Sequence, residues 1–484
     1  MASTSPISTP ESCTGLPRRN PVIERKSVVI RTCSSSSPSP CPRKNTTVPT
    51  ARITAVTTTP HRKLRRNSSS TLAPSIPAAA PRRWRAARAR PPPCRTGDVP
   101  GDPTSDVLAA TIAAAADVRT PALVLDLDAL DHNVATAVAR IGAARWMPHV
   151  KTAKQRIVVD ALLGAGVRAF KAATLEEVDL VAAAARAADT DVEILLAHPP
   201  WGANADGAVR RVAEAEATGV RIALLADGPE HLEHLAERAR GLGATTIPVY
   251  ADLDVGMHRT GRPPEAWYAA ADRLRRPPFV LVGLSAYEGH LRWSDRDEAA
   301  AIHRRVADVA RRLGVEHVVT SGTHAFAHAL ASADLAEGPF HARVSPGTIV
   351  FGDRRSREAM GHLGLRQAAY VATRVISAPR ADRRTCDAGS KAIAPDCPAP
   401  GLEVVGHPEL RPLPRSEEHL PLAVDGPTDV RCGDVLLLVP DHVCTTVNLH
   451  REALWVRDGR VVGFGPVEAR ARHLYDPRDR EDAP

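Results

Sequence analysis

The chain has 484 residues, which is long enough for more than one average domain, and its formal net charge is +8. The first 100 residues carry 18 Lys and Arg against 3 Asp and Glu, so residues 101–484 have a net charge of about −7. A mildly acidic body argues against a nucleic-acid partner, which would need a basic surface.

Residues 1–105 are dominated by Ser, Thr, Pro and Arg and show no apolar period, so we expect a disordered leader. Its prolines argue against a targeting helix, and no apolar run has the length of a secretion signal or a membrane span. We therefore expect a cytoplasmic protein without a membrane partner. The next methionine after Met1 is Met147, which leaves open whether the leader is translated or functional.

From residue 117 onward, short apolar runs alternate with segments of helical periodicity, a pattern that predicts βαβ units and a parallel sheet. About eight such units fit a closed (β/α)8 barrel of the TIM type over residues 117–355. An open doubly wound sheet is disfavoured because no GxGxxG follows the first strand. The predicted strands are Ala122–Leu127, Arg145–Val150, Ala169–Ala173, Val192–Ala197, Arg221–Ala226, Ile247–Leu253, Phe279–Tyr287 and Val315–Ser321. Predicted helices include Leu130–Ile141, Lys154–Leu163, Leu175–Ala185, Ala208–Ala217 and Ala299–Leu313.

Beyond the barrel, the helical periodicity weakens and β-rich runs are broken by Pro, Gly and Asp. We predict a C-terminal all-β domain over residues 356–472 and a charged tail over residues 473–484. The β-rich runs are Ala368–Ser377, Asp434–Val439, Ala453–Val456 and Val461–Phe464.

The ends of the predicted barrel strands carry the residues that suggest chemistry, as is usual for this architecture. Lys151 ends the second strand, where partial desolvation lowers the proton affinity of a lysine and allows it to attack an aldehyde. Two small turns, Thr320–Thr323 and Ser345–Thr348, can offer backbone N–H groups to a phosphate. A lysine and two phosphate-type turns on one rim indicate pyridoxal phosphate.

Several longer motifs then resemble a known family. Over about residues 117–472 the chain is similar to the fold-type III pyridoxal-phosphate enzymes, and within them to the D-threonine aldolase and D-serine dehydratase family. The motifs are Thr120–Asp128 (TPALVLDLD), Pro148–Thr152 (PHVKT), Asp254–Gly261 (DVGMHRTG), Tyr287–His290 (YEGH), Pro346–Thr348 (PGT), Asp387–Lys391 (DAGSK), Ser416–His419 (SEEH) and Pro440–Asn448 (PDHVCTTVN).

The resemblance implies a role for each site residue. Lys151 would form the Schiff base with the cofactor, and Arg259 would donate to its phenolic oxygen. The phosphate would be held by Ser321, Gly322, Gly347 and Thr348, while Tyr287 and His290 would line the pocket, with His290 a candidate catalytic base. The turn around Ser321 has fewer glycines than is usual for the family.

A second chemical centre is predicted at His442 and Cys444. Residues two apart on a strand point to the same face, so imidazole and thiolate would converge on a metal ion. The resemblance supports this centre, because the family binds a divalent metal at these positions. The soft thiolate favours Zn²⁺, with Mn²⁺ as the other possibility.

The implied activity is that of a lyase for β-hydroxy D-amino acids, of the D-threonine aldolase type, giving glycine and an aldehyde. The alternative is a D-serine dehydratase, which gives pyruvate and ammonia. An amino-acid racemase is less favoured because Ser345 stands where racemases have Arg before Pro-Gly, and a non-catalytic cofactor carrier would lack the β domain. The resemblance also implies a homodimer. The physiological substrate stays open.

Overall fold

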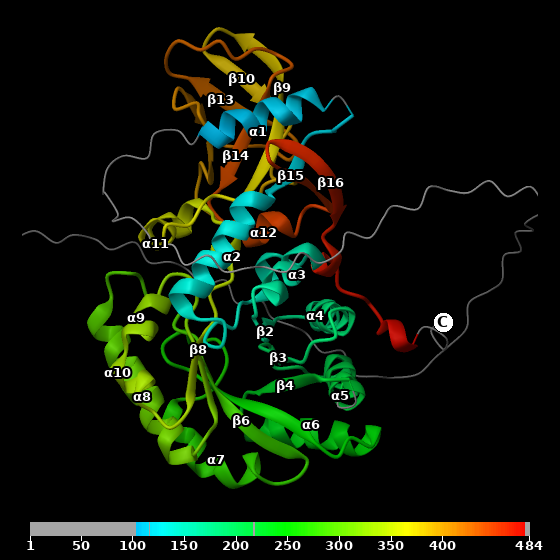
Figure 1. The fold of residues 1–484 in the computed structure, drawn as a ribbon, viewed down its shortest axis with the longest axis vertical. Helices are drawn as coiled ribbons and strands as arrows, with labels where there is room; N and C mark the ends of the chain where they lie inside the picture. The colour runs from blue at the N-terminus through cyan, green and yellow to red at the C-terminus, as the bar shows by residue number, and fades with distance from the viewer. Residues whose placement is uncertain (1–102, 116, 216–217, 480–484) are drawn as a thin grey trace, which may run out of the picture. The chain divides into compact units, whose positions relative to one another are not determined.

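The computed structural model describes residues 103–115, 117–215 and 218–479 (Figure 1). The leader predicted over residues 1–105 falls outside this part of the chain except for its last three residues, with which helix α1 (Pro103–Ala114) begins. The last five residues of the predicted charged tail, 480–484, fall outside it as well.

Seven parallel strands form a curled sheet in the order β2-β3-β4-β5-β6-β7-β8. Helices that follow the strands cover the outer face of the sheet (Figure 1), and because both faces are then buried the strands are largely apolar. The strands are β2 (Ala169–Ala172), β3 (Val192–Leu196), β4 (Val220–Ala226), β5 (Ile247–Leu253), β6 (Phe279–Ala286), β7 (His317–Thr320) and β8 (His341–Val344). The helices are α2 (Leu127–Ile141), α3 (Arg156–Gly164), α4 (Leu175–Ala187), α5 (Ala203–Ala215), α6 (Pro229–Leu242), α7 (Trp267–Leu274), α8 (Arg296–Leu313), α9 (Phe326–Ala331) and α10 (Ala333–Ala336).

The segment 145–149 joins the two edges of this sheet. Trp146 pairs with Val344 at the end of β8, and His149 pairs with Lys171 in β2. The Lys171 amide donates to the carbonyl of Pro148 at 3.0 Å. Because Pro148 has no N–H of its own to donate, the segment makes isolated bridges in place of a regular strand. The predicted (β/α)8 barrel is confirmed. The segment 145–149 lies between β8 and β2 and takes the place of the one strand that the seven-stranded sheet lacks.

One predicted strand belongs to the other sheet. We expected Ala122–Leu127 to open the barrel, and this is wrong: those residues form β1 (Ala122–Asp126), which pairs with strands of the C-terminal sheet. The barrel strand that we did not predict is β8, whose sequence HARV is too polar to stand out as an apolar run. Periodicity identifies a strand but does not say which sheet it joins.

A second sheet, of nine mostly antiparallel strands, confirms the predicted β domain. Its main path runs β12-β13-β10-β9-β1-β15-β16, while β14 pairs with β9 and β11. Helix α1 packs through Leu108 and Ile112 on the face that contains Val124. The other strands are β9 (Ala369–Arg380), β10 (Arg383–Cys386), β11 (Leu402–Val404), β12 (Leu410–Pro412), β13 (Leu420–Val424), β14 (Val435–Pro440), β15 (Glu452–Arg457) and β16 (Arg460–Pro466), with helices α11 (Arg357–Leu363) and α12 (Val443–Val447).

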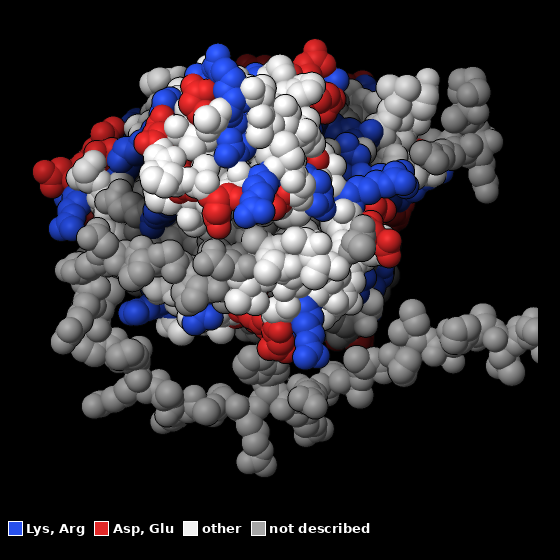
Figure 2. Space-filling model, turned by 90° about the horizontal axis from the view of Figure 1, so that it is seen from above, with Lys and Arg blue, Asp and Glu red and all other residues white. Residues whose placement is uncertain are grey.

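Charges of both signs share the surface of the described residues. On the face seen in Figure 2, Lys and Arg side chains are interspersed with Asp and Glu, and neither sign covers that face alone. Among the helices of the described residues, none is long and apolar enough to cross a membrane.

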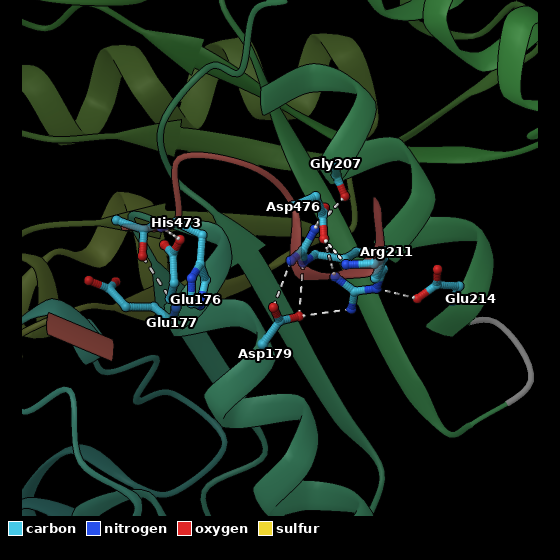
Figure 3. A network of polar contacts seen from close by, with 10 residues as sticks. Glu176, Glu177, Asp179, Gly207, Arg211, Glu214, His473 and Asp476 are labelled. Carbon is cyan, nitrogen blue, oxygen red and sulfur yellow. Dashed lines mark hydrogen bonds and ion pairs between the residues drawn. The ribbon is translucent and has the colours of Figure 1, made fainter. Parts of the chain in front are cut away.

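After β16 the chain returns to the outside of the barrel and is held there by ion pairs (Figure 3). Arg211 of α5 is almost fully buried, and its guanidinium binds Asp179 of α4 at 2.7 Å and Asp476 at 2.6 Å. Arg478 adds a bond to Asp179 at 3.1 Å and one to Glu214 at 3.0 Å. Buried charges need such partners, so this network fixes residues 473–479 against α4 and α5.

We predict that Asp476→Asn lowers the free energy of unfolding by about 1–2 kcal/mol, because the buried Arg211 loses a charged partner. Urea denaturation measures this change. The matched control is Glu214→Gln, whose side chain is half exposed and should cost less than about 0.5 kcal/mol. Equal effects of the two substitutions would show that Asp476 does not hold the C-terminal segment.

Candidate active site

A cavity of about 240 Å³ lies where the carboxyl ends of the barrel strands meet the turn after β14. This is the rim on which barrel enzymes place their chemistry. Of the ten predicted site residues, two do not line the cavity, Ser321 and His290. The cavity brings together the other eight: Lys151, Arg259, Tyr287, Gly322, Gly347, Thr348, His442 and Cys444.

Lys151 lies in a single turn of 3-10 helix, Val150–Thr152, directly after the barrel-closing segment. His149 begins this turn, and its Nδ1 accepts a hydrogen bond from the Lys151 amide at 3.4 Å. Burial, together with the charges of Lys151 and Lys171, holds the pKa of His149 well below its usual range. The His149 ring is therefore neutral at pH 7 and can accept that bond.

Lys154 anchors the turn that carries Lys151. Its backbone has a φ of +54°, a left-handed conformation that is uncommon for lysine. The buried ammonium lies 3.2 Å from Glu177 Oε1 on α4 and donates to the Ala469 carbonyl at 3.3 Å, while the Ala469 amide donates back to Lys154 at 3.1 Å. The loop of Lys151 is thus fixed from two sides.

The two predicted phosphate turns follow β7 and β8. At Gly347, a Cβ atom would lie 2.4 Å from the carbonyl oxygen of His149, so only glycine fits there. Ser321 is fully buried, and its amide and hydroxyl donate to the Glu288 carboxylate at 2.9 and 2.6 Å. Glu288 in turn lies 3.0 Å from His303. Ser321 therefore holds the turn through Glu288, on the side away from the cavity, whereas Gly322 lines the cavity.

Arg259 and Tyr287 lie together on the side of β5 and β6. The Arg259 guanidinium carbon is 5.2 Å from the centre of the Tyr287 ring, a cation–π distance. The loop of Arg259 is shaped by Asp254, whose Oδ1 accepts the amides of Gly256 and His258 at 3.0 Å each. The Arg259 guanidinium therefore lines the cavity, and the contacts of Asp254 hold its loop in place.

His290 turns away from the cavity. Its Nε2 lies 3.3 Å from Glu298, and its Nδ1 is buried without a hydrogen-bond partner among the described residues. The ring packs against Gly256, where an added Cβ would lie 2.7 Å from it. In this arrangement His290 shapes the loop of Arg259 and does not reach the space inside the cavity.

His442 and Cys444 converge, but not for the reason that we gave. They are not on a strand: β14 ends at Pro440, His442 is the extended N-cap of α12, and Cys444 lies in its first turn. His442 Nδ1 lies 2.6 Å from Asp396 Oδ2. Cys444 Sγ lies 3.1 Å from the hydroxyl of Thr152, next to Lys151. The β domain thus contributes this pair to the barrel cavity.

His442 and Cys444 shift each other's pKa in opposite directions. The hydrogen bond with Cys444, aided by Asp396, raises the pKa of His442 to about 9 despite burial. Burial favours the neutral thiol of Cys444, but the hydrogen bond and charge of His442 outweigh it and leave the pKa of Cys444 below its usual range. An imidazolium at His442 and a thiolate at Cys444 therefore stabilise each other. Among the described residues, no group of three or more His, Cys, Asp or Glu is arranged to hold a metal.

Several cavity residues were missed in the sequence, among them four that can titrate and lie beside the predicted ones. Lys171 in β2 and Asp252 in β5 are single charged residues within otherwise apolar runs, and that break in the pattern was the available signal. His149 was quoted only as a neighbour of Lys151. His324 follows the β7 turn, and burial lowers its pKa.

The same two parts of the chain match known families. Residues 125–355 match the N-terminal domain of alanine racemase, and residues 368–456 match the serine dehydratase domain. These matches define the class as an alanine racemase-like barrel joined to a dehydratase-type β domain.

The chain belongs to the D-threonine aldolase family. It is 30% identical over 399 residues to the D-threonine aldolase of Arthrobacter sp., covering 79% of this chain and 97% of that protein. It is 26% identical to the 3-hydroxy-D-aspartate aldolase of Paracoccus denitrificans (strain Pd 1222), covering 74% of this chain and 93% of that one. In fold it is similar to the crystal structure of D-threonine aldolase from Filomicrobium marinum, with a TM-score of 0.64 and 23% identity over 73% of this chain and 96% of that one. The family and its fold imply pyridoxal phosphate as the cofactor.

We predict that His442→Asn slows the alkylation of Cys444 by iodoacetamide at pH 7 about tenfold, because without the imidazolium the pKa of the half-buried thiol rises and less thiolate is present. Peptide mass spectrometry in the presence of a chelator measures the rate. The exposed Cys432 in the same molecule is the internal reference and should react unchanged. A constant ratio of the two rates would contradict the lowering of the Cys444 pKa by His442.

Proposed function

We propose that this protein is a pyridoxal-phosphate- and divalent-metal-dependent lyase of β-hydroxy D-amino acids that forms glycine and an aldehyde. The observation that carries this proposal is that Lys151 and the His442–Cys444 pair line one cavity. A substrate can therefore reach the lysine and the metal pair at the same time. The 30% identity to a D-threonine aldolase over nearly its whole length supports the aldolase reaction.

The residues of the cavity fit pyridoxal phosphate. The side chain of Lys151 lines the space, and the glycine-only turn at Gly347 lets backbone amides approach a phosphate closely. Gly322 and Thr348 would complete that cradle, and Arg259 would face the phenolic oxygen. Bound there, the cofactor would store the electron pair that is released when a bond to Cα breaks.

The residues also fit a divalent metal, in a two-ligand arrangement. His442 and the Cys444 thiolate would hold it, and water and substrate oxygen would fill the remaining positions. The bond from His442 to Asp396 is the kind of outer contact that orients a metal-binding imidazole. A thiolate favours Zn²⁺ over Mn²⁺. Such a metal would supply acidity to the β-hydroxyl of the substrate.

Proton movement then depends on neutral bases in the cavity. Both His149 and His324 line it, and burial keeps the pKa of each below its usual range, so both rings can accept a proton at pH 7. In the aldolase reaction the β-hydroxyl must lose its proton. In the dehydratase reaction the proton lost is the one on Cα. The charge of His442 contributes to the lowered pKa of His324, and we therefore choose His324 as the candidate acceptor of the β-hydroxyl proton.

The proposed protein is a cytoplasmic homodimer, on the basis of the family resemblance. Fold-type III enzymes build their sites near a subunit interface. Sedimentation of the purified protein gives the mass of the assembly directly.

Incubation with D-threonine and, separately, with D-serine tests the proposed reaction. We expect glycine and acetaldehyde from D-threonine, loss of activity after chelation, and recovery when Zn²⁺ is added. The Lys151→Ala variant, which lacks the amine, is the inactive control. Pyruvate and ammonia from D-serine, without glycine from D-threonine, would contradict the aldolase proposal and favour the dehydratase.

A further inference from the structure

Lys171 is a buried cation in the cavity and has no close carboxylate partner among the residues that the structure describes. It is the third residue of β2, its side chain is 5% exposed, and it lines the cavity beside Lys151 and Arg259. Within the described part of the chain, no carboxylate lies within 4.0 Å of its ammonium, although Asp252 and Glu288 act on it from farther away. A buried ammonium is costly unless an anion pairs with it, so this position calls for an anionic ligand.

The neighbouring carboxylates are engaged elsewhere. Glu288 is held by His303 at 3.0 Å and by the hydroxyl of Ser321 at 2.6 Å, and it does not line the cavity. Asp252 accepts a hydrogen bond from Thr260, and burial raises its pKa to about 6. Burial also lowers the pKa of Lys171, to about 8, so its ammonium remains mostly protonated at neutral pH.

The order of the strands says which part of the cofactor Lys171 can reach. Lys151 leaves the barrel between β8 and β2, because the segment before it pairs with both. The phosphate turns at Gly322 and Gly347 follow β7 and β8 and lie on one side of it, whereas Lys171 lies in β2 on the other side. On the pyridoxal ring, the aldehyde carbon stands between the phosphate-bearing arm and the phenolic oxygen. Lys171 is therefore on the phenolic side.

We propose that Lys171 is a further cofactor-binding residue, whose ammonium contacts the phenolic oxygen of pyridoxal phosphate together with Arg259. This inference rests on the proposed cofactor but not on the reaction catalysed. Two cations at one oxygen would hold it as the anion and would bind the ring by charge-assisted hydrogen bonds. The contact also pairs the charge of Lys171, which has no close carboxylate partner within residues 103–115, 117–215 and 218–479.

The test compares two ligands on the cofactor-free protein: pyridoxal phosphate and 3-deoxypyridoxal phosphate, which lacks the phenolic oxygen. Their dissociation constants are measured by absorbance titration without substrate, for the wild type and for Lys171→Met. We expect the wild type to prefer pyridoxal phosphate, and Lys171→Met to lose at least about tenfold of that preference. The difference between the two ligands isolates the contact with one oxygen.

The controls separate the possible failures. Lys391→Met removes a lysine that is exposed and paired with Glu417, and it should leave both constants unchanged. Lys171→Gln replaces Lys171→Met if the latter does not fold. An unchanged preference in the Lys171 variant, or an equal loss for both ligands, would overturn the inference. If the wild type binds neither ligand, the proposed function itself fails.

Discussion

The closure of the barrel by the segment 145–149 is the constraint on which the site depends. A parallel barrel needs its last strand to pair with its first, and here that pairing is reduced to bridges of Trp146 and His149, because Pro148 cannot donate a hydrogen bond. The chain is thereby free to turn into a short 3-10 helix directly at the rim. Lys151 is the second residue of that helix, and its position follows from where the barrel closes.

The site then needs both sheets. The barrel supplies Lys151, the two small turns and the loop of Arg259, while the turn after β14 brings His442 and Cys444 into contact with Thr152. Strand β1, which precedes the barrel in the chain, pairs within the second sheet. The C-terminal segment around Asp476 packs back against the barrel helices. Lys154 ties the loop of Lys151 to this returning segment through Ala469. Lys151 and the His442–Cys444 pair are therefore held in place by the same set of contacts.

What the sequence could predict follows from how local each feature is. Lys151, Arg259 and the turn of Gly347 lie in continuous motifs at strand ends, so their common location was predictable from strand order. The pairing of β1 with β9 was not predictable, because an apolar run does not indicate which strand it pairs with. His442 and Cys444 line the same cavity, and the start of a helix positions them in place of the strand that we expected.

Other features depended on contacts distant in sequence. The placement of His290 is set by Gly256 and Glu298, neither of which the YEGH motif reveals. Lys171 and Asp252 were missed because each is one charged residue in an apolar strand, where a solvent-facing side chain was the simpler interpretation. Only the closed barrel shows that both side chains point inward.

The most direct test of the account is to trap the cofactor on the protein and find the residue that carries it. The cavity holds two lysines, and the structure places the more accessible one, Lys151, on the rim and Lys171 within the barrel wall. Borohydride reduction of the cofactor-loaded protein, followed by peptide mass spectrometry, should find the pyridoxyl group on Lys151. A label on Lys171, or no label on any lysine, would contradict the account.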